Sequence, residues 1–316
     1  MRQLRAAVKR SPRLRTLLFG LQNAGSIVRR GDIALTGSGQ AKYFLAAMIR
    51  VKDEARFLPE WLAYHYTIGV EHVFIYDNNS SDHTAAVISP FIERGLVTYI
   101  KWPPVPASPS SHLDFLARFG CEAEWVIFFD ADEFLFEQTP GSLLSILRAS
   151  HKQPALAFNW RYFGSSGHEL IPDGLVIENF NQADSTLNHH VKVVARPRAI
   201  RRYRNSHNFY YRAGKLARTL DGRRVAGSFS EPSDDPPIVL HHYVYRSKAD
   251  YERKTTQGFV DSRGALDQGR QANRVELEFR KHNQVRIVPL PGVLRRTQVF
   301  LEELGYDKQF YRPSKA

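Results

Sequence analysis

Four short apolar segments in the first half of this chain restrict its fold more than any other feature. They are five to nine residues long and are separated by stretches with the spacing of helices. Apolar runs of this length are typical of strands that are buried on both faces of a sheet. We predict strands at residues 43–51, 72–76, 96–101 and 125–129. Strands that alternate with helices predict a doubly wound, mostly parallel α/β sheet.

The stretches between the strands carry the usual signals of helix ends. Residues 58–68 place their apolar side chains on one face, with Pro59 in the first turn and Gly69 directly after the last. Residues 103–111 are rich in proline and are expected to form a loop. Beyond residue 155 the pattern changes to shorter strands and loops. The helices that we predict cover residues 58–68, 82–94, 112–121 and 295–304.

The composition of the 316 residues excludes several classes of protein. Apolar residues make up 43% and aromatic residues 12%, so the chain can bury a sizeable core and is not expected to be disordered. Cys121 is the only cysteine, which excludes an intrachain disulfide framework and a cysteine-based zinc site. Apolar runs of about 18 residues are absent, and the N-terminal apolar stretch is too short for a secretory signal. We therefore expect a cytoplasmic location.

Positive charge is concentrated in two segments. The net charge is +12, and residues 1–30 hold eight Lys or Arg without an acid, while residues 192–224 hold eleven against one Asp. Such segments predict anionic partners, namely phosphates, a membrane surface or nucleic acid, with a solvated basic surface as the simpler alternative. Residues 1–30 also interleave Leu and Val with Arg and Lys, as in a basic helix on the inner face of a membrane, but Pro12 would interrupt it.

Asp130 and Asp132 follow the fourth predicted strand. In open α/β sheets, ligands bind beyond the carboxyl ends of the strands. Residues two apart on an extended chain point to the same side, so both carboxylates would converge. Two convergent carboxylates suit Mg²⁺ or Mn²⁺, which proteins often hold with one or two carboxylates together with substrate phosphates. The alternative is an acidic turn that caps a helix.

Two further strand ends carry polar residues on the same predicted edge. Asp77 ends the second strand, and its carboxylate could accept hydrogen bonds from a ribose or a base. Asn78 and Asn79 after it favour a tight turn, so an ordinary connection between strand and helix is the alternative. Glu54 or Asp53, after the first strand, could face a nucleobase or cap the following turn.

Several motifs follow one another in a fixed order along residues 43–260. They are residues 52–55, 57–62, 69–82 and 129–134 with its Asp-x-Asp signature, then 160–168, 190–192, 207–209, and His242 and Tyr243 with Lys248, Tyr251 and Lys254. In this order they resemble glycosyltransferases of the GT-A fold, of the family 2 and family 92 type. The resemblance implies an α/β fold with a Rossmann-like, mostly parallel central sheet flanked by helices and a smaller C-terminal acceptor-side region.

The resemblance also implies an organisation and an activity. The regions are a basic N-terminal extension and linker at 1–40, a nucleotide-sugar-binding half at 41–155, an acceptor-side half at 156–290, and a C-terminal helix and tail at 291–316. The implied activity is metal-dependent transfer of a sugar, expected to be a hexose, from a nucleotide-diphosphate sugar to a hydroxyl of a glycan or glycolipid in polysaccharide or glycoconjugate synthesis. We expect a UDP-sugar donor and an inverting rather than a retaining reaction.

By the same resemblance, Asp130 and Asp132 would bind Mn²⁺ or Mg²⁺ and the donor diphosphate. His241 or His242 would complete the metal shell. Adjacent residues of a strand face opposite sides, so only one of the two can do so, and His242 matches the family better. The residues expected to contact the nucleoside or the phosphates are Glu54, Asp77, Asn79, Asp130, Lys192, Lys248 and Lys254.

The resemblance does not identify the catalytic base. An inverting transfer needs a carboxylate or an imidazole near the acceptor hydroxyl. Many family 2 enzymes carry it in a Glu-Asp pair followed by a Gln-x-x-Arg-Trp motif, and neither is found here. Glu169 and His168 follow a glycine-rich turn at 164–167 on the expected acceptor side, and Asp173 is a further candidate. The turn could equally shape the acceptor pocket, and a retaining enzyme would need no such base.

Two other functions are compatible with parts of the sequence. A metal-dependent phosphotransfer enzyme also places Asp-x-Asp after a strand, but its motif continues to Thr or Val, whereas Glu133 and Phe134 follow here. A basic protein that binds membrane or nucleic acid through a non-catalytic GT-A-like domain would leave the acidic strand ends unexplained. Its binding should weaken steeply with salt and need no metal. We expect no nucleic-acid partner, and an anionic membrane surface as the candidate partner of residues 1–30.

Overall fold

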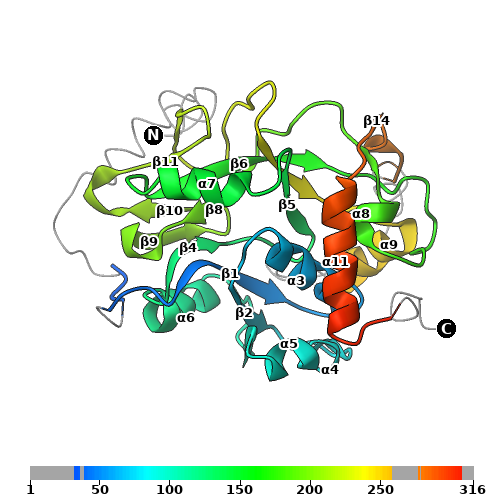
Figure 1. Cartoon of the computed structure of the whole chain (residues 1–316), viewed down its shortest axis with the longest axis horizontal. Helices are drawn as coiled ribbons and strands as arrows, with labels where there is room; N and C mark the ends of the chain where they lie inside the picture. The colour runs from blue at the N-terminus through cyan, green and yellow to red at the C-terminus, as the bar shows by residue number, and fades with distance from the viewer. Residues whose placement is uncertain (1–31, 36–38, 258–276, 278, 308–316) are drawn as a thin grey trace.

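The computed structural model describes residues 32–35, 39–257, 277 and 279–307 (Figure 1). The predicted basic extension at residues 1–30 lies outside the described residues. Among the helices that are described, none combines the length and the apolar character needed to cross a bilayer.

The first half of the chain forms the parallel part of a ten-stranded sheet. Its strands are β1 (Tyr43–Val51), β2 (His72–Asp77), β3 (Val97–Lys101) and β4 (Ala123–Ile127). They lie in the order β3-β2-β1-β4, and each pairs in parallel with its neighbour. The α/β fold class and the mostly parallel central sheet predicted from the sequence are confirmed.

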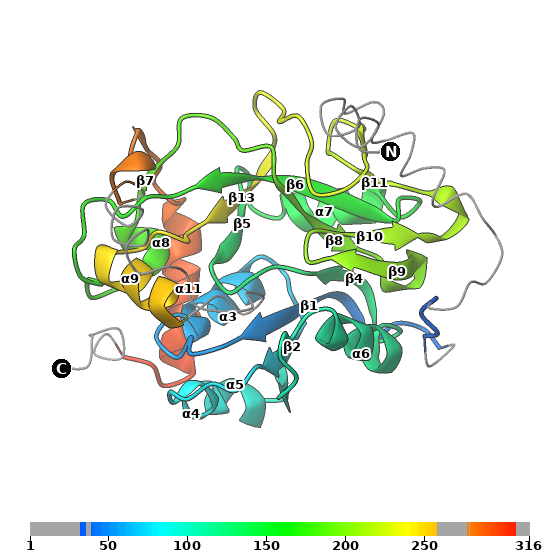
Figure 2. The same ribbon diagram turned by 180° about the vertical axis from the view of Figure 1, so that it is seen from behind.

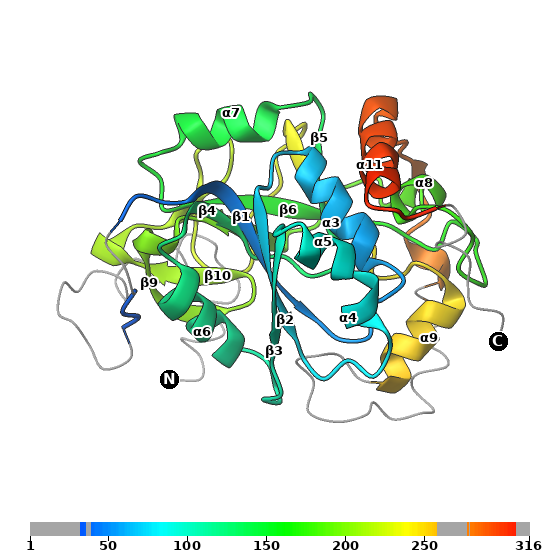
Figure 3. The same ribbon diagram turned by 60° about the horizontal axis from the view of Figure 1, so that its bottom comes forward.

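Both faces of this parallel region are covered by helices, which explains why its strands are mostly apolar. Alternate residues of β1 enter two separate cores. Leu45 packs in the core that contains Trp61 of α3 (Leu58–Thr67), and Ala46 packs in the core that contains Phe115 of α6 (Ser110–Phe119). Figure 3 shows α3 and α6 on opposite sides of β1, β2 and β3.

Two predicted helices differ from the observed ones. The helix predicted at 82–94 is divided into α4 (Thr84–Val87) and α5 (Ser89–Glu93). Pro90 lies in the first turn of α5 and has no N–H group to continue a hydrogen-bonded helix from α4. The last helix, α11 (Pro291–Glu303), begins four residues before its predicted start, with proline in the first turn, where its missing N–H is not needed.

The second half of the chain extends the sheet with strands of mixed direction. These are β5 (Glu133–Glu137), β6 (Ala155–Tyr162), β8 (Val191–Ala195), β11 (Ala217–Arg218), β12 (Arg224–Val225) and β13 (Ile238–His242). β8 runs antiparallel between β4 and β6, whereas β13 pairs in parallel with β6 and antiparallel with β5. The chain therefore leaves the parallel part of the sheet after β4, and Asp130 and Asp132 lie in the connection to β5.

Smaller elements surround this framework. They are α7 (Ser142–Ala149), α8 (Val176–Asn179), α9 (Lys248–Gln257), the hairpin of β9 (Ile200–Asn205) and β10 (Asn208–Tyr211), the pair of β7 (Gln182–Ala183) and β14 (Val285–Arg286), and the 3₁₀ turns Pro197–Ala199 and Arg212–Gly214. Figure 2 shows α9 at the end of the molecule toward which β1 points. Since that is the edge where the strands end, α9 is placed to contribute side chains there.

The basic segment at 192–224 makes many internal contacts. Arg201 Nε lies 3.0 and 3.1 Å from the two carboxylate oxygens of Asp32, and Arg212 Nη2 donates to the carbonyl of Ile33 at 2.9 Å. Arg218 Nη1 donates to the carbonyl of Gly222 at 2.6 Å. Part of this positive charge therefore fastens residues 32 and 33 to the β9–β10 hairpin. An anionic partner for the rest of the segment stays a prediction.

Candidate functional site

The loops after β1 and β2 are joined by hydrogen bonds and form one rim of the site. Asp53 Oδ1 accepts the N–H of Ser81 at 2.6 Å and that of Asp82 at 3.2 Å. Asp82 Oδ2 in turn accepts the N–H of Ala55 at 3.0 Å. Asp53 and Asn79 have φ values of 55° and 61°, which Asp and Asn tolerate better than other side chains do. Asp53 is therefore a bridge between the two loops, and Glu54 beside it is held in place.

Asp77 is buried at the end of β2 and already has partners for both oxygens. Oδ1 accepts the N–H of Ser80 at 2.8 Å, and Oδ2 accepts the hydroxyl of Tyr99. Asn79, which is exposed, donates from Nδ2 to the carbonyl of Pro103 at 3.1 Å. These contacts organise the turn and the proline-rich loop. Nucleoside contacts of Asp77 and Asn79 stay predictions.

Asp130 and Asp132 lie on a turn and not on an extended strand, so the geometry that the sequence analysis assumed for them is wrong. β4 ends at Ile127, and the N–H of Glu133 donates to the carbonyl of Asp130 at 3.1 Å. The physical reason is that β5 begins at Glu133 and must turn away to pair with β13. Trp61 of α3 fixes this turn by donating from Nε1 to the carbonyl of Glu133 at 2.8 Å. As a result, the two carboxylates meet different partners.

Asp130 is bound by two cationic side chains. Lys192 Nζ lies 2.6 Å from its Oδ2, and Arg50 Nη2 lies 3.3 Å from its Oδ1. Lys192 is only 1% exposed and also lies 3.4 Å from Oε2 of Glu133. Burial would raise the pKa of Asp130, but Lys192 and Arg50 outweigh it and hold this pKa well below its usual range. Lys192 was predicted to contact phosphate; its ammonium is turned toward the two carboxylates beneath the site, and a phosphate contact stays a prediction.

Glu133 is the second carboxyl that Lys192 contacts. Its side chain is fully buried, and its Oε2 accepts the N–H of Asp130 at 2.8 Å. Burial raises the pKa of Glu133 to about 7, against the opposing effect of Lys192. Lys192 therefore serves two carboxylates at once, and opposing burial, their charges raise the pKa of its ammonium. This arrangement fixes the Asp130 side of the turn.

Asp132 faces a different set of nitrogens. Its Oδ2 lies 2.9 Å from Nζ of Lys254 on α9, and its Oδ1 lies 3.5 Å from Nε2 of His242 at the end of β13. All three side chains are between 11% and 13% exposed. Burial would raise the pKa of Asp132, but Lys254 and His242 hold it well below its usual range. Asp132 is therefore ionised, nearly enclosed and reachable from α9.

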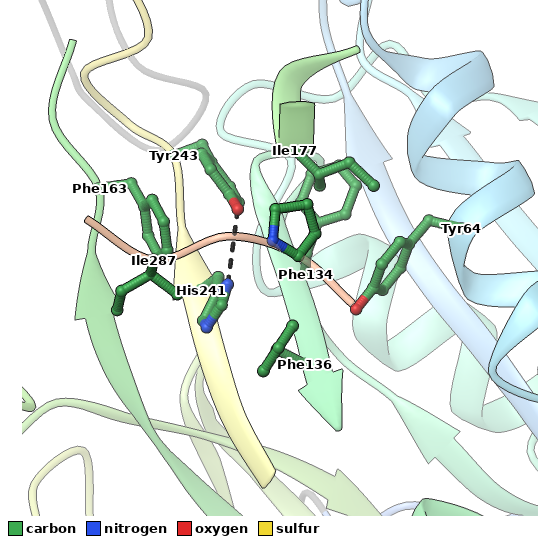
Figure 4. A pocket seen from close by; sticks show the side chains of 9 residues that line it. Tyr64, Phe134, Phe136, Phe163, Ile177, His241, Tyr243 and Ile287 are labelled. Atoms are coloured by element: carbon green, nitrogen blue, oxygen red, sulfur yellow. Dashed lines mark hydrogen bonds between the residues drawn. The ribbon is translucent and has the colours of Figure 1, made fainter. Parts of the chain in front are cut away.

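Only one of the two adjacent histidines is directed at the acidic turn. His241 is buried on the other side of β13, where its ring is stacked on Phe136 with centroids 4.5 Å apart. It lines a small aromatic cavity shown in Figure 4, in which the hydroxyl of Tyr243 lies 3.5 Å from its Nδ1. This cavity has a volume of about 10 Å³, roughly that of one water, so it is too small for a sugar.

Glu54 lies near Asp132 because both its carboxylate oxygens face cations from α9 and from the loop before that helix. Its Oε2 lies 3.4 Å from Nη2 of Arg246, and its Oε1 lies 3.9 Å from Nζ of Lys254. Arg246 is buried, with its guanidinium carbon 3.4 Å from the centre of the Phe57 ring and its Nε 3.0 Å from Asp250 Oδ2. The structure thus unites Glu54, Asp132 and Lys254, which come from three distant segments of the sequence.

A second cluster gathers residues from the other predicted motifs. Trp160 of β6 is in ring contact with His190, His207 and His242, with centroids 4.9, 5.2 and 4.4 Å apart. Burial, with a smaller effect of Lys192, lowers the pKa of His207 to about 4, and burial likewise lowers that of His190. Both rings are therefore neutral near pH 7, and they form an aromatic wall beside His242.

Glu169 and His168, the candidate bases, lie at the start of α9. Their carbonyls accept the N–H groups of Ala249 and Lys248 at 3.0 and 3.2 Å. The Glu169 side chain is 67% exposed and lies 3.9 Å from Nζ of Lys248, and the His168 ring contacts Phe180. In the described part of the chain, these contacts are with α9 and with Phe180 directly after α8. A role of either residue as base stays a prediction.

The donor set can be tested for a divalent cation. Within the described residues, no three His, Cys, Asp or Glu side chains are grouped closely enough to hold a metal ion. Two of the three predicted ligands nevertheless converge, because the 3.5 Å between Asp132 Oδ1 and His242 Nε2 suits neighbouring ligands at about 2.1 Å from one ion. Asp130 is turned to Lys192 instead. Asp132 and His242 therefore fit a cation that takes its other ligands from substrate and water.

Sequence reasoning missed Arg50, Glu133 and Arg246. Arg50 is a charged residue inside an otherwise apolar strand, and Glu133 directly follows the Asp-x-Asp signature, so each had a local signal of a buried ion pair. Arg246 had a local signal only in Asp250, four residues later, because its other partners Glu54 and Phe57 lie almost two hundred residues earlier in the chain.

Comparison with known proteins gives one family. The model of the family described as Glycosyltransferase family 92 matches residues 46–215. A family 92 protein of Ricinus communis is 30% identical over 258 residues, covering 76% of this chain and 42% of the relative. A family 92 protein of Oryza sativa subsp. japonica is 35% identical over 156 residues, covering 48% of this chain and 26% of the relative. The chain thus spans less than half the length of these curated relatives.

Solved structures with some similarity have low scores. S. aureus TarS 1-349 in complex with UDP-GlcNAc has a TM-score of 0.38 at 12% identity, and the match covers 84% of this chain and 72% of the TarS chain. A mannosyltransferase from Pyrobaculum calidifontis in complex with GDP-Man and Mn²⁺ has a TM-score of 0.31 at 16% identity and covers 48% of this chain and 45% of its own.

Proposed function

Because this chain belongs to glycosyltransferase family 92, we propose that it transfers a sugar from a nucleotide-diphosphate sugar to a hydroxyl of a glycan or glycolipid. The observation that carries the proposal is the convergence of Asp132, His242, Glu54 and Lys254 at the carboxyl ends of the strands. A hexose, a UDP-sugar donor and a role in polysaccharide or glycoconjugate synthesis are parts of the same proposal. Family membership favours sugar transfer over the alternative of phosphotransfer.

In this proposal, Asp132 and His242 hold a divalent cation, Mn²⁺ or Mg²⁺. When bound, it would supply positive charge against the diphosphate that leaves with the nucleoside. Asp132 is suited to hold it because Lys254 and His242 keep the pKa of its carboxyl low, so that it stays ionised. Asp130, fixed by Lys192 and Arg50, sets the shape of the turn that presents Asp132.

In the inverting transfer that we propose, the acceptor oxygen bonds to the anomeric carbon while the bond from that carbon to the diphosphate oxygen breaks. The nucleoside diphosphate leaves with the electron pair, and the acceptor proton passes to a base. Glu169 and His168 remain our candidates for that base, because their loop joins the start of α9, which also carries Lys254. The wall formed by Trp160 and its histidines would border the acceptor.

The test combines a donor screen with one substitution. Uridine, guanosine and cytidine diphosphates and their sugar nucleotides are added with and without Mn²⁺, and metal-dependent thermal stabilisation by one base identifies the donor class. Asp132→Asn should then lower transfer and donor hydrolysis by about a hundredfold or more, with an unchanged circular dichroism spectrum. Asp234→Asn, an exposed acid far along the chain, serves as the control. Normal turnover in Asp132→Asn would refute the assignment.

We also propose a cytoplasmic location in which residues 1–30 contact the inner face of a membrane. The support is the concentration of eight basic residues without an acid in this segment.

A further inference from the structure

Lys254 contacts two carboxylates of the candidate donor site. Its ammonium lies 2.9 Å from Asp132 Oδ2 and 3.9 Å from Glu54 Oε1, and its side chain is 11% exposed. Asp132 is the proposed metal ligand, and Glu54 is the residue expected to contact the nucleoside. A cation of the chain itself therefore lies between the two groups that the donor and its metal would use.

The backbone that carries Lys254 is held by buried groups, whereas its ammonium is paired with the carboxylates of Asp132 and Glu54. Arg246 and Asp250 are buried and paired at 3.0 Å, and Arg246 also reaches Glu54 at 3.4 Å. The N–H of Asp250 donates to Ser247 Oγ at 3.1 Å. Lys254 lies one helical turn beyond Asp250, so its long side chain can change partners while the start of α9 stays in place.

We propose that Lys254 is a stand-in cation: it neutralises Asp132 before the donor arrives, and its ammonium moves to the donor diphosphate when a metal ion takes Asp132. The inference rests on the proposed function. A divalent cation held by Asp132 Oδ1 and His242 would lie close to the ammonium that Asp132 Oδ2 holds at 2.9 Å, and the two positive charges would repel each other. The diphosphate of the donor is the anion that the displaced ammonium would meet in the same space. Lys254 is thus a positioning residue that links the two binding events.

This exchange predicts a coupling between metal and nucleotide. Without nucleotide, the metal has to displace Lys254 from Asp132, so it binds less tightly than it does when nucleotide is present. Nucleotide draws Lys254 away from Asp132 and makes the metal bind more tightly, and by reciprocity the metal favours the nucleotide equally. A lysine that acted only through its charge would change each affinity separately but would leave the coupling between them unchanged. Coupling therefore separates partner exchange from simple electrostatics.

The experiment measures that coupling in the full chain. Mn²⁺ binding is followed by the electron paramagnetic resonance signal of free Mn²⁺, with and without saturating uridine diphosphate, and the solution complex of the two is subtracted. The proteins are wild type, Lys254→Met, Lys254→Gln, the charge-conserving Lys254→Arg, and Lys152→Met. Lys152 is an exposed lysine in the turn between α7 and β6, and its substitution removes the same charge away from the site.

Both neutral variants should bind Mn²⁺ alone about tenfold more tightly, the scale of one charge-assisted hydrogen bond. The factor by which uridine diphosphate strengthens Mn²⁺ binding should fall by about tenfold in them, and it should persist in Lys254→Arg and Lys152→Met. An unchanged factor in both neutral variants, or an equal fall in Lys152→Met, would overturn the inference while leaving the proposed function intact. Failure of wild type to bind Mn²⁺ with uridine, guanosine or cytidine diphosphate would overturn both.

Discussion

Replacing Glu60 with glutamine tests how the loop that carries Glu169 is held against the sheet. Glu60 lies in α3, is fully buried, and accepts the N–H groups of Val176 and Ile177 at 2.6 and 3.0 Å. Burial raises the pKa of its carboxyl from 4.5 to about 7, although these two N–H groups and Arg56 act in the opposite direction. Glu60 therefore fixes the loop through two hydrogen bonds, and the free energy needed to keep its carboxyl ionised in the folded protein depends on pH.

The sign and size of this dependence follow from linkage. The folded protein holds the proton of Glu60 more tightly than the unfolded chain does, so stability falls as pH rises from 4.5 through 7. A difference of about 2.5 pH units at about 1.36 kcal/mol each gives about 3 kcal/mol in full, of which roughly 2–3 kcal/mol is lost between pH 5 and pH 8. Glutamine does not titrate, but its NH₂ group would face one of the two backbone N–H groups. The lost hydrogen bond lowers the free energy of unfolding of the variant by about 1–3 kcal/mol, and this loss does not itself change with pH.

Urea unfolding of wild type and Glu60→Gln between pH 5 and pH 8 measures both quantities. The variant should be about 1–3 kcal/mol less stable than wild type at pH 5 and should gain roughly 2–3 kcal/mol relative to wild type by pH 8, so that the difference vanishes or changes sign. Glu133, whose pKa burial also raises to about 7, titrates in both proteins and cancels in the difference. Glu93→Gln, at an exposed position of α5, should follow wild type at every pH. A difference between Glu60→Gln and wild type that stays constant with pH would refute the reasoning.

Three further changes have definite expected outcomes. Gly69→Ala should lower stability by about 1–3 kcal/mol, because φ is +104° and the new Cβ would come within 2.6 Å of Leu144. Gly95→Ala is the control: its φ is +70°, no atom lies within 4 Å of the new Cβ, and it should cost about 1 kcal/mol. Equal losses in thermal unfolding would contradict this. Lys192→Met should lower the free energy of unfolding in urea by about 3 kcal/mol, because it leaves the buried Glu133 carboxyl without its cation and Asp130 with Arg50 alone, and a neutral effect would show that the pairing is dispensable. Removing residues 1–30 should weaken sedimentation with anionic vesicles and leave nucleotide binding intact; unchanged vesicle binding would remove the membrane proposal.

The strands were predictable because each is a buried apolar run with a defined end. All four lie within two residues of their predicted bounds, since α3 and α6 cover opposite faces and favour apolar side chains on both. The helix at 82–94 could not be drawn correctly from apolar spacing alone, because Pro90 interrupts the hydrogen bonds that would join its halves. β5 and α7 were not predicted, because β5 is defined by its pairing with β13, a hundred residues later.

The candidate site was predictable only where strand geometry decides it. Alternation along β13 places His242 and His241 on opposite sides, and the structure has His242 beside Asp132. The same reasoning failed for Asp130, because the extended chain that it assumed is replaced by the turn into β5. Arg246 and the approach of Lys254 depend on how α9 packs, and no local pattern encodes that.

The charges of the site divide into a permanent and an exchangeable part. Lys192 and Arg246 are each 1% exposed, and each is paired with a buried carboxyl, Glu133 for Lys192 and Asp250 for Arg246. Moving either cation away from its partner would leave a buried group without its counter-charge. Lys254 is more accessible, and its two partners, Asp132 and Glu54, are the carboxylates that face the proposed donor. The proposed donor would bring a diphosphate and a divalent cation to this site, and one internal charge that can move would accommodate both. Lys192, Arg246 and Arg50 are 1%, 1% and 7% exposed, against 11% for Lys254, so Lys254 is the cation, among those described at the acidic turn, that can move at the smallest cost.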